Sequence, residues 1–432
     1  MLQLSISYQQ LPVPIEEWKQ KAIVWANQHH EAVAYYSSNN IDYRHGAFKN
    51  LLGVRKCCQG SNSVIASTWQ ELKNLQESTV TPLLGFLTYD LKNSLENLTS
   101  QHPDNIGFPE LAFFAPEAYI HFEEETLTVY SEVDSPDSII QAISSTTFSS
   151  SFPKNSLKTV ARISREEYIQ SVQKLQQHIV EGDVYEINFC QEFYAEQASL
   201  DPVQVYFKLN EISPTPFSGF LKWHDKYLLC ASPERFLKKE NDLLISQPIK
   251  GTIRRGSTPE EDLANKATLA SSEKERAENM MIVDLVRNDL NRVAAIGTVK
   301  VEEFFGLYGF QHVWQMISTI TGKLSPEADA VQALQAAFPM GSMTGAPKIK
   351  ALELIEKYEK TKRGLYSGSF GYFLPNGDFD FNVVIRSIQY NAATRYLNYE
   401  VGSAITYDSV PEQEYEECLL KAFAIKSVLE KH

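Results

Sequence analysis

One lysine of the chain lies in a sequence environment that suits chemistry. Lys250 stands in the stretch SQPIKGTIRRG, between an apolar Pro248-Ile249 pair and a Gly251-Thr252 turn. Glu234, in the stretch SPERF, precedes it by one predicted hairpin. A carboxylic acid and an amine at the ends of paired strands suit an acid catalyst beside a nucleophile or an anion-binding group. A surface ion pair worth under about 1 kcal/mol is the alternative.

Two predicted helices each carry a pair of glutamates three residues apart. The stretch SSEKERAENMMIVDLVRNDLNRV contains Glu275 and Glu278, and VPEQEYEECLLKAFAIKSVLEKH contains Glu414 and Glu417. Residues three apart share one face of a helix. If the two helices converge, their carboxylates could bind one hard cation, and Mg²⁺ prefers a few carboxylates plus waters. The alternative for the first pair is a plain helix start, in which Ser272-x-x-Glu275 is a capping box and the acidic residues stabilise the helix N-terminus.

A glycine-rich stretch, FPMGSMTGAPKIKALELIEKYEK, predicts a turn that leads into a helix near Pro347. Exposed amides at a helix N-terminus suit an anionic group. The stretch is not a phosphate-binding loop of the Walker type, because no Gly-Lys-Ser/Thr follows at the required spacing. A plain connection between elements is the alternative.

The composition limits the classes of partner. The 432 residues are 43% hydrophobic and 22% charged, as in a globular protein, and the formal net charge is -14. Such a charge argues against nucleic acid or an anionic membrane as the main partner, so an anionic substrate needs locally placed cations. No membrane span or signal peptide is recognised. Five cysteines without metal spacing predict reduced thiols in a cytoplasmic protein.

The elements that must position these residues are strands and helices without regular alternation. Residues 135–159 are rich in Ser and Thr and predict a linker. Strand-like runs such as EAVAYYS come before it, and a helix that opens with Ser164-x-x-Glu167, a capping box, follows it. The remainder mixes strands and helices irregularly. The pattern therefore favours an α+β fold over a doubly wound parallel sheet.

Taken in order, these motifs resemble the chorismate-utilising enzymes, which include anthranilate synthase component I, aminodeoxychorismate synthase component I, isochorismate synthase and salicylate synthase. The resemblance extends from IVEGDVYEINFCQEF to the C-terminus and includes SPERF, PIKGT, KERAENMMIVDLVRND, STITG, FPMGSMTGAPKIKALELI, GLYSGSFGYF, VVIRS and EYEECLLKA. It implies two packed antiparallel sheets with helices outside and an active site in the cleft between halves. Residues 1–145 match more loosely than residues 160–432, and we expect both regions to form one intertwined unit.

Lys250 distinguishes branches of this family. Anthranilate synthases typically read PIAGT, whereas PIKGT looks like aminodeoxychorismate synthase. There the family lysine attacks C2 of chorismate as the C4 hydroxyl leaves, and ammonia then enters at C4 and expels the lysine. The product is 4-amino-4-deoxychorismate, a precursor of p-aminobenzoate and folate. A nucleophilic lysine needs its neutral form favoured, by burial or by a cation such as Arg254, Arg255 or Mg²⁺.

The resemblance also implies roles for other residues. Glu234 matches the general acid that protonates the departing hydroxide, which requires a raised pKa. Glu278 and Glu417 match the Mg²⁺ ligands, with Glu275 and Glu414 beside them. The implied substrate contacts are Gly251, Thr252, Thr344, Tyr366, Arg386 and Gly402. A tryptophan pocket, a further feature of the family, would consist of Ser37 or Ser38 together with Pro216, Phe217 and Ser218.

Two positions depart from the family pattern. Gln315 stands where the family usually has histidine, and nearby His312 is a candidate substitute. Glu186 stands where the family usually has glutamine or, in the members that add water, lysine. The absence of that lysine argues against isochorismate and salicylate synthases.

The partners implied by the resemblance are chorismate, ammonia and a glutamine amidotransferase subunit. No cysteine lies in a nucleophile-elbow context, so we expect ammonia to come from a separate glutaminase or from solution. Three other functions remain open. They are anthranilate synthase component I, a pyridoxal-phosphate enzyme with Lys250 as its Schiff base, and a non-catalytic regulator that binds chorismate or tryptophan.

Overall fold

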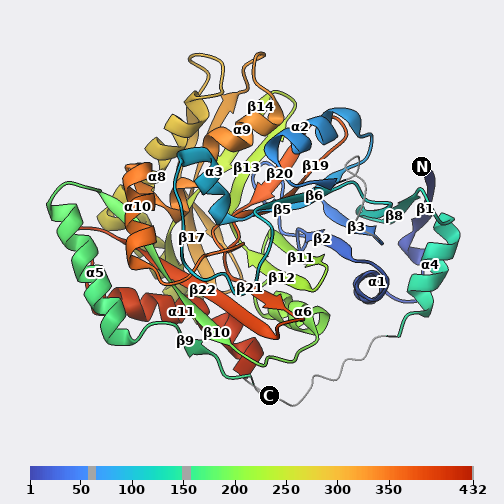
Figure 1. Cartoon of the computed structure of the whole chain (residues 1–432), viewed down its shortest axis with the longest axis horizontal. Coiled ribbons are helices and arrows are strands. Elements are labelled where there is room, and N and C mark those ends of the chain that lie inside the picture. The colour runs from blue at the N-terminus through green and yellow to red at the C-terminus, as the bar shows by residue number, and fades with distance from the viewer. Residues whose placement is uncertain (57–64, 148–156, 431–432) are drawn as a thin grey trace.

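The computed structural model describes residues 1–56, 65–147 and 157–430. In these ranges the strands form two antiparallel sheets with helices outside them, which confirms the predicted α+β class (Figure 1). The prediction for Cys57 and Cys58 lies outside the described residues, whereas Cys190, Cys230 and Cys418 are buried free thiols. No helix in the described parts of the chain combines the length and the apolar character that a membrane crossing requires.

The larger sheet contains strands from both ends of the chain. In spatial order they are β1 (Leu2–Ser7), β8 (Thr126–Ser131), β7 (Ala118–Phe122), β3 (Asn50–Arg55), β2 (Ala32–Ser37), β11 (Phe217–Trp223), β12 (Lys226–Ser232), β21 (Ser387–Asn391), β22 (Tyr396–Ile405), β10 (Glu186–Ala195) and β18 (Gly345–Ala346), with β9 (Val160–Ala161) paired to β10. β2 pairs with β11, so an early strand lies beside a strand from the middle of the chain.

The smaller sheet is built in the same way. Its order is β15 (Ile249–Arg254), β17 (Val313–Lys323), β14 (Leu243–Gln247), β13 (Arg235–Glu240), β20 (Phe379–Asn382), β19 (Ser369–Phe373), β5 (Leu83–Leu87), β6 (Leu111–Phe114) and β4 (Ile65–Ala66), with β16 (Lys300–Gly309) paired to β17. β5 pairs with β19, so the strands that precede residue 145 are distributed over both sheets.

The two sheets pack face to face through aromatic side chains. Tyr36 of β2 stacks on Phe370 of β19 with ring centroids 4.3 Å apart, and its hydroxyl donates a hydrogen bond to the carbonyl of Gly371 at 2.5 Å. Gly219 of β11 allows this approach, since a Cβ there would lie 2.4 Å from the Phe370 ring. The interior between the sheets is therefore a dry aromatic core, and the outer faces are left for helices.

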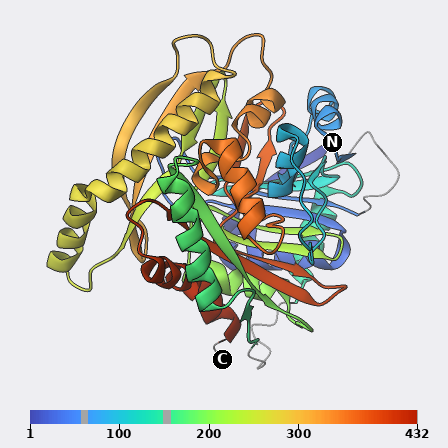
Figure 2. The ribbon, with the colours of Figure 1, turned by 60° about the vertical axis from the view of Figure 1, so that its left-hand side comes forward.

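Helices cover both outer faces (Figure 2). A core on the larger sheet includes residues of α1 (Ile15–His29), α4 (Pro136–Ser145), α5 (Arg165–Val180), α6 (Pro202–Ile212), α10 (Lys348–Tyr358) and α11 (Pro411–Glu430). A core on the smaller sheet includes residues of α2 (Trp69–Ser78), α8 (Glu273–Asn291) and α9 (Ala330–Ala337). The remaining helices are α7 (Pro259–Ser271), α3 (Lys92–Glu96), and the 3₁₀ turns η1 (Tyr8–Gln10), η2 (Tyr89–Leu91) and η3 (Gly341–Met343).

The prediction of a linker at residues 135–159 is wrong for its first part, which forms α4. The hydroxyl of Ser135 accepts the backbone N–H of Ser138 at 3.2 Å, and Pro136 occupies the first turn. Ile139 and Ile143, four residues apart, are buried on the larger sheet. Serine and proline in this stretch begin a helix rather than prevent one. Residues 148–156 lie outside the described residues.

The predicted helix starts that position the site are confirmed. Ser164 and Glu167 form the capping box of α5. α8 begins after Ser272, whose hydroxyl accepts the backbone N–H of Glu275, and α10 begins after Pro347. α8 packs on β15 and β17, and α11 packs on β22, so the two glutamate-bearing helices border strands that carry other candidate residues (Figures 1 and 2).

Candidate active site

Lys250 enters the interior because the strand that carries it is irregular. The pairing of β15 with β17 shifts register between Ile249 and Thr252. Gly251, at φ +100°, lies inside this bulge, and a Cβ there would come within 3.1 Å of Oε2 of Glu275. Glycine is needed at this position both for its backbone conformation and for the close approach of α8. Lys250 is consequently buried, with 9% of its surface exposed.

Carboxylates surround the Lys250 ammonium. Its Nζ donates to Oε1 of Glu186, the first residue of β10, at 2.5 Å. Burial alone lowers the pKa of Lys250, but the negative charges of Glu186, Glu278 and Glu234 outweigh it, and the pKa is raised above its ordinary value. The expectation that the surroundings favour the neutral amine is therefore wrong for the ligand-free protein.

The cations expected beside Lys250 point elsewhere. Arg255 pairs with Asp262 of α7 at 2.7 Å and lies over the Trp314 ring. The Arg254 side chain is 82% exposed and lies 3.6 Å from Glu261. The two arginines follow the bulge on an edge strand, where α7 supplies nearer carboxylates, so they do not counter the charge around Lys250.

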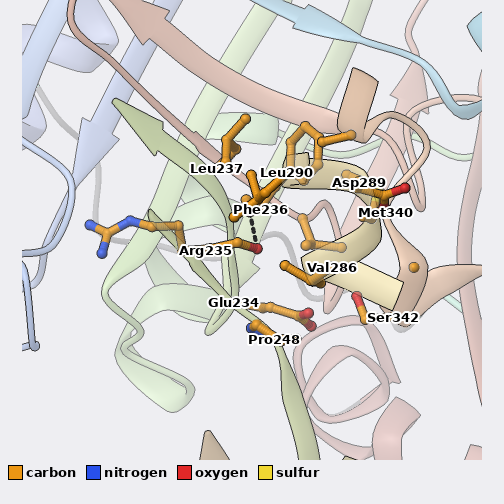
Figure 3. A pocket seen from close by; sticks show the side chains of 14 residues that line it. Glu234, Arg235, Phe236, Leu237, Pro248, Val286, Asp289, Leu290, Met340 and Ser342 are labelled. Carbon is orange, nitrogen blue, oxygen red and sulfur yellow. Dashed lines mark hydrogen bonds between the residues drawn. The ribbon is translucent and has the colours of Figure 1, made fainter. Parts of the chain in front are cut away.

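Glu234 has the environment of a general acid. It lies between β12 and β13, is 4% exposed, and lines a small pocket in which its carboxyl faces the Ser342 hydroxyl of η3 (Figure 3). Burial raises the pKa of Glu234 from 4.5 to about 7, although hydrogen bonds from Ser342 and the Ile249 N–H and the charge of Lys250 oppose the shift. Near neutral pH a large fraction of this carboxyl keeps its proton.

Carboxylates from both glutamate pairs lie around one lysine, a convergence that the spacing within each helix left open. Lys274 of α8 places its Nζ 3.7 Å from Oε1 of Glu278 on the same helix and 3.9 Å from Oε1 of Glu414 on α11. Glu275 and Glu417 also act electrostatically on Lys274, whose pKa is raised because the four carboxylates outweigh its burial. The two helices therefore bring four carboxylates around one ammonium.

These residues fit a divalent cation. Glu278 is 8% exposed, and its Oε1 lacks a hydrogen-bond partner within the described residues. Burial raises the pKa of Glu278 to about 7 and also raises that of Glu275, and the positive charges of Lys250 and Lys274 oppose these shifts without cancelling them. Glu417 differs, because Lys421, 2.6 Å away, outweighs burial and lowers its pKa. Hard oxygen ligands with uncompensated charge suit Mg²⁺.

The ligand atoms of this cluster are not closed around a single point in the ligand-free protein. No three of the four carboxylates approach within 4.8 Å of one another in the described ranges, where His178, Glu181 and Asp183 form a closer set. Lys274 occupies the space between Glu278 and Glu414, and its side chain is half exposed. A bound cation would replace the Lys274 ammonium as the positive charge between Glu278 and Glu414.

Three of the predicted substrate contacts, Arg386, Tyr366 and Gly402, lie near one another. Arg386, at φ +53° between β20 and β21, makes no ion pair with any described residue, and Tyr366 and Glu417 act on its guanidinium electrostatically. Cys190 places its Sγ 3.7 Å from the buried Tyr366 hydroxyl. The Gly402 carbonyl accepts from Lys421, and a Cβ on Gly402 would lie 2.4 Å from Sγ of Cys190.

The two predicted threonine contacts differ from this group. The Thr344 side chain is fully buried, and its hydroxyl bonds within its own turn to the carbonyls of Met340 and Gly341. Thr252 is exposed on β15, opposite Gln315 of β17. Both side chains are thus directed by local backbone geometry, and their contact with a substrate stays a prediction.

The histidine substitute proposed for Gln315 lies in a different place. His312 is exposed in the turn before β17, and its Nε2 lies 3.0 Å from the carbonyl of Ile212. Gln315 is 4% exposed, and its Oε1 has no hydrogen-bond partner among the described residues. The amide oxygen of Gln315 can accept a hydrogen bond from a ligand. His312 lies elsewhere and cannot take over this role.

The predicted tryptophan-binding residues do not share one face of the larger sheet, because Phe217 belongs to the core between the sheets and Ser218 faces α6 on the outer side. Ser37 lies directly opposite Ser218 in the pairing of β2 with β11. The Ser218 hydroxyl donates to Oδ1 of Asn210 at 2.6 Å, and the Ser38 hydroxyl donates to Oδ1 of Asn50 at 3.2 Å. Phe217, which follows Pro216, packs edge-on against two aromatic rings and beneath the Arg235 guanidinium. Tryptophan binding stays a prediction.

The sequence pattern of one family, described as chorismate binding enzyme, matches residues 25–427. The chain belongs to this family. The match covers every strand except β1 and every candidate residue discussed above, so the resemblance recognised from the later motifs extends to the N-terminal region from β2 onward.

Relatives in this family carry two different names. The chain is 36% identical over 362 residues to aminodeoxychorismate synthase component 1 of Bacillus subtilis, covering 80% of this chain and 76% of that protein. It is 33% identical over 374 residues to anthranilate synthase component 1 of Acetivibrio thermocellus, covering 81% and 75%. The crystal structure of anthranilate synthase component I from Streptococcus pneumoniae superposes with a TM-score of 0.73 at 24% identity, covering 99% of this chain and 92% of that one.

Sequence reasoning left four side chains of the site without an assigned role. Glu186 was recognised as a departure from the chorismate-binding family but not as the partner of Lys250, and Ser342 was not singled out within its glycine-rich turn. Lys274 and Lys421 lie four residues from Glu278 and Glu417, respectively. That spacing is a readable signal on a helix, whereas the contact between β10 and β15 leaves no local signal.

Proposed function

We propose that the chain is an aminodeoxychorismate synthase component I, which converts chorismate and ammonia to 4-amino-4-deoxychorismate for p-aminobenzoate and folate biosynthesis. One observation carries this proposal. A buried lysine, Lys250, stands in one site with a buried carboxyl, Glu234, whose pKa is raised to about 7. A nucleophile and a general acid are the two groups that displacement of a hydroxyl through a covalent intermediate requires.

Lys250 favours this function over anthranilate synthesis. Aminodeoxychorismate synthases predominate among the relatives, and the identity is 36% to the Bacillus subtilis protein against 33% to the anthranilate synthase of Acetivibrio thermocellus. An amine that bonds to C2 of the substrate blocks that carbon, so ammonia must enter at C4. With alanine at this position, C2 stays open and receives the ammonia instead.

Lys250 and Glu234 carry out different steps of the proposed reaction. The lone pair of Lys250 Nζ forms a bond to C2, the ring double bonds shift, and the C4–O bond breaks. Glu234 donates its proton to the departing hydroxide, which leaves as water. Ammonia then attacks C4, the bond from C2 to Lys250 breaks, and the Glu234 carboxylate takes a proton from the new ammonium. The enzyme is then as it was at the start.

Binding of a dianionic substrate to an acidic protein requires cationic groups. Arg386 suits a bidentate contact with one carboxylate of chorismate, because its guanidinium has no competing ion pair among the described residues. Glu278, Glu417, Glu275 and Glu414 would hold Mg²⁺, which neutralises the other substrate carboxylate. Ammonia would be supplied by a glutamine amidotransferase subunit.

The test is the product formed from chorismate, Mg²⁺ and ammonia, identified by mass spectrometry with and without a lyase that releases p-aminobenzoate. We expect 4-amino-4-deoxychorismate from the wild type. Without ammonia, the peptide that contains Lys250 should gain the mass of chorismate minus water. Anthranilate from the wild-type protein would identify the alternative function and reject this one.

Substitutions of Lys250 test whether its amine is the nucleophile. Lys250→Ala should form no adduct, and any residual amination should shift to C2. Lys250→Arg should be equally inactive, because a guanidinium stays protonated. Lys300→Ala, on exposed β16 of the same sheet, is the matched control and should keep wild-type activity. Production of 4-amino-4-deoxychorismate by Lys250→Ala at the wild-type rate would reject the covalent route.

A further inference from the structure

Glu186 and Lys250 form an ion pair that is almost completely buried. Glu186 is 1% exposed and Lys250 is 9% exposed, and the two side chains meet at 2.5 Å. Within the described residues, no other carboxylate lies within 4.0 Å of the Lys250 ammonium. Such a pair has lost most of its hydration, so its charges are held at a considerable cost in solvation free energy.

The second oxygen of Glu186 is also informative. Oε2 is buried and has no hydrogen-bond partner among the described residues. The backbone around it is fixed, because Glu186 pairs with Ala346 of β18 and the N–H of Tyr185 donates to the Ala346 carbonyl at 2.7 Å. Glu186 is therefore held against Lys250 by the backbone pairing of β10 with β18, with one of its oxygens free of other hydrogen bonds from the described residues.

The proposed function, on which this inference rests, leaves one proton without a destination. Lys250 is an ammonium in the ligand-free protein and must lose a proton before it can attack carbon. Glu234 cannot accept that proton, because it must deliver its own proton to the hydroxide. We propose that Glu186 is the group that accepts the Lys250 proton when substrate fills the site and returns it when the amine leaves.

Substrate binding supplies the reason for the transfer. A bound ring displaces the remaining water from Lys250 and Glu186, and a dry ion pair is penalised more heavily than a neutral amine beside a neutral acid. The proton moves from Nζ to a Glu186 oxygen, and the freed lone pair forms the bond to C2. After ammonia expels the amine, the proton returns to Nζ, so no proton is gained or lost at this pair over a turnover.

Other charged groups face the pair from each neighbouring element. Glu275 and Glu278 come from α8, Glu234 precedes β13, and Lys421 of α11 acts on Glu234 and Glu275. Substituting Glu186 changes the nearest of these charges and leaves the others in place. The pH dependence of a Glu186 variant, compared with the wild type, therefore isolates this one contact.

The experiment measures the rate of adduct formation on Lys250 from chorismate and Mg²⁺ without ammonia, by intact-protein mass in rapid-quench samples at several pH values. Glu186→Gln should lower this rate at least about a hundredfold near neutral pH, while the KM for chorismate stays within about threefold. The ratio of variant to wild-type rate should rise about tenfold for each pH unit, because bulk solvent then sets the fraction of free amine. Any effect of Glu234 ionisation is common to both proteins and cancels in this ratio.

Two further variants separate a proton acceptor from a structural support. Glu186→Asp should keep part of the rate, and added formate should restore part of the rate of Glu186→Ala. Glu192→Gln, a buried carboxylate variant on the same strand, should change stability and leave the pH dependence unchanged. A Glu186→Gln protein that forms the adduct at the wild-type rate and with its pH dependence overturns this role alone. A wild type that forms no adduct overturns the covalent mechanism and this role together.

Discussion

Replacement of Glu234 by glutamine should stabilise the protein while it removes activity. The carboxyl has a pKa of about 7 in the folded protein and an ordinary value of 4.5. Between these two values the folded chain binds more protons than the unfolded chain, so this group lowers the free energy of unfolding as pH rises from 4.5 to 7, and the full loss persists above 7. Glutamine does not titrate, so the variant escapes that loss.

The size of the effect follows from the shift. At about 1.4 kcal/mol for each pH unit, Glu234 costs the wild type about 3 kcal/mol at pH 8 and close to nothing at pH 4.5. The glutamine oxygen can still accept from Ser342 and from the Ile249 N–H, so few other contacts change. For a chain of this length, about 3 kcal/mol corresponds to about 3 °C in Tm.

The assay is thermal unfolding of the metal-free, substrate-free protein at several pH values between about 5 and 8.5. The Tm of Glu234→Gln minus that of the wild type should increase across this range and level off above pH 7. Glu77→Gln, on the exposed face of α2, is the control and should give a difference that does not vary with pH. Parallel Tm curves for Glu234→Gln and wild type would refute the raised pKa. Turnover by Glu234→Gln should fall by at least about a hundredfold, because the hydroxide loses its proton donor.

Three other substitutions test separate parts of the structure. Glu278→Gln should abolish Mg²⁺-dependent turnover and weaken Mg²⁺ binding in calorimetry, and the Tm of the metal-free variant should rise above pH 7 as in Glu234→Gln, since burial also raises the pKa of Glu278 to about 7; unchanged metal dependence would remove Glu278 from the ligand set. His312→Ala should cost less than about tenfold in kcat/KM, about 1.4 kcal/mol, because the exposed His312 ring bonds to the Ile212 carbonyl and not to any candidate residue of the site; a loss of about a thousandfold would give it a catalytic role. Asp380→Asn should destabilise the protein by about 3–5 kcal/mol in denaturant unfolding, since it leaves the fully buried Arg235 guanidinium without its carboxylate, and an unchanged midpoint would contradict this.

The sequence carried a large part of the fold and of the site. Helix starts such as Ser164 and Ser272 are written in three or four consecutive positions, and the structure has both helices there. The i,i+3 spacing of Glu275 with Glu278 and of Glu414 with Glu417 is a property of each helix by itself. The motifs around Lys250 and Glu234 identified the family without any coordinates. These signals are local, because each depends only on residues within one helix turn or one short motif.

Local sequence signals gave wrong predictions where contacts with distant residues decide the structure. Serine and proline near residue 136 favour a loop and a helix start equally, and burial of Ile139 and Ile143 on the larger sheet selects the helix. Arg254 and Arg255 follow Lys250 closely in sequence. However, Arg254 is exposed at the edge of the sheet and Arg255 pairs with Asp262 of α7, so neither arginine neutralises the charge around Lys250.

The contact between Glu186 and Lys250 was decided by the tertiary structure alone. Sixty-four positions separate the two residues, and they meet because β10 begins opposite β18 while the bulge at Gly251 turns β15 inward. The convergence of Glu278 and Glu414 on Lys274 depends in the same way on how α8 and α11 pack on different sheets. The sequence by itself determined which acids and amines this protein carries and which helix faces they share. Strand register and sheet packing determined which of them touch, because those depend on contacts between distant segments that no short window of sequence contains.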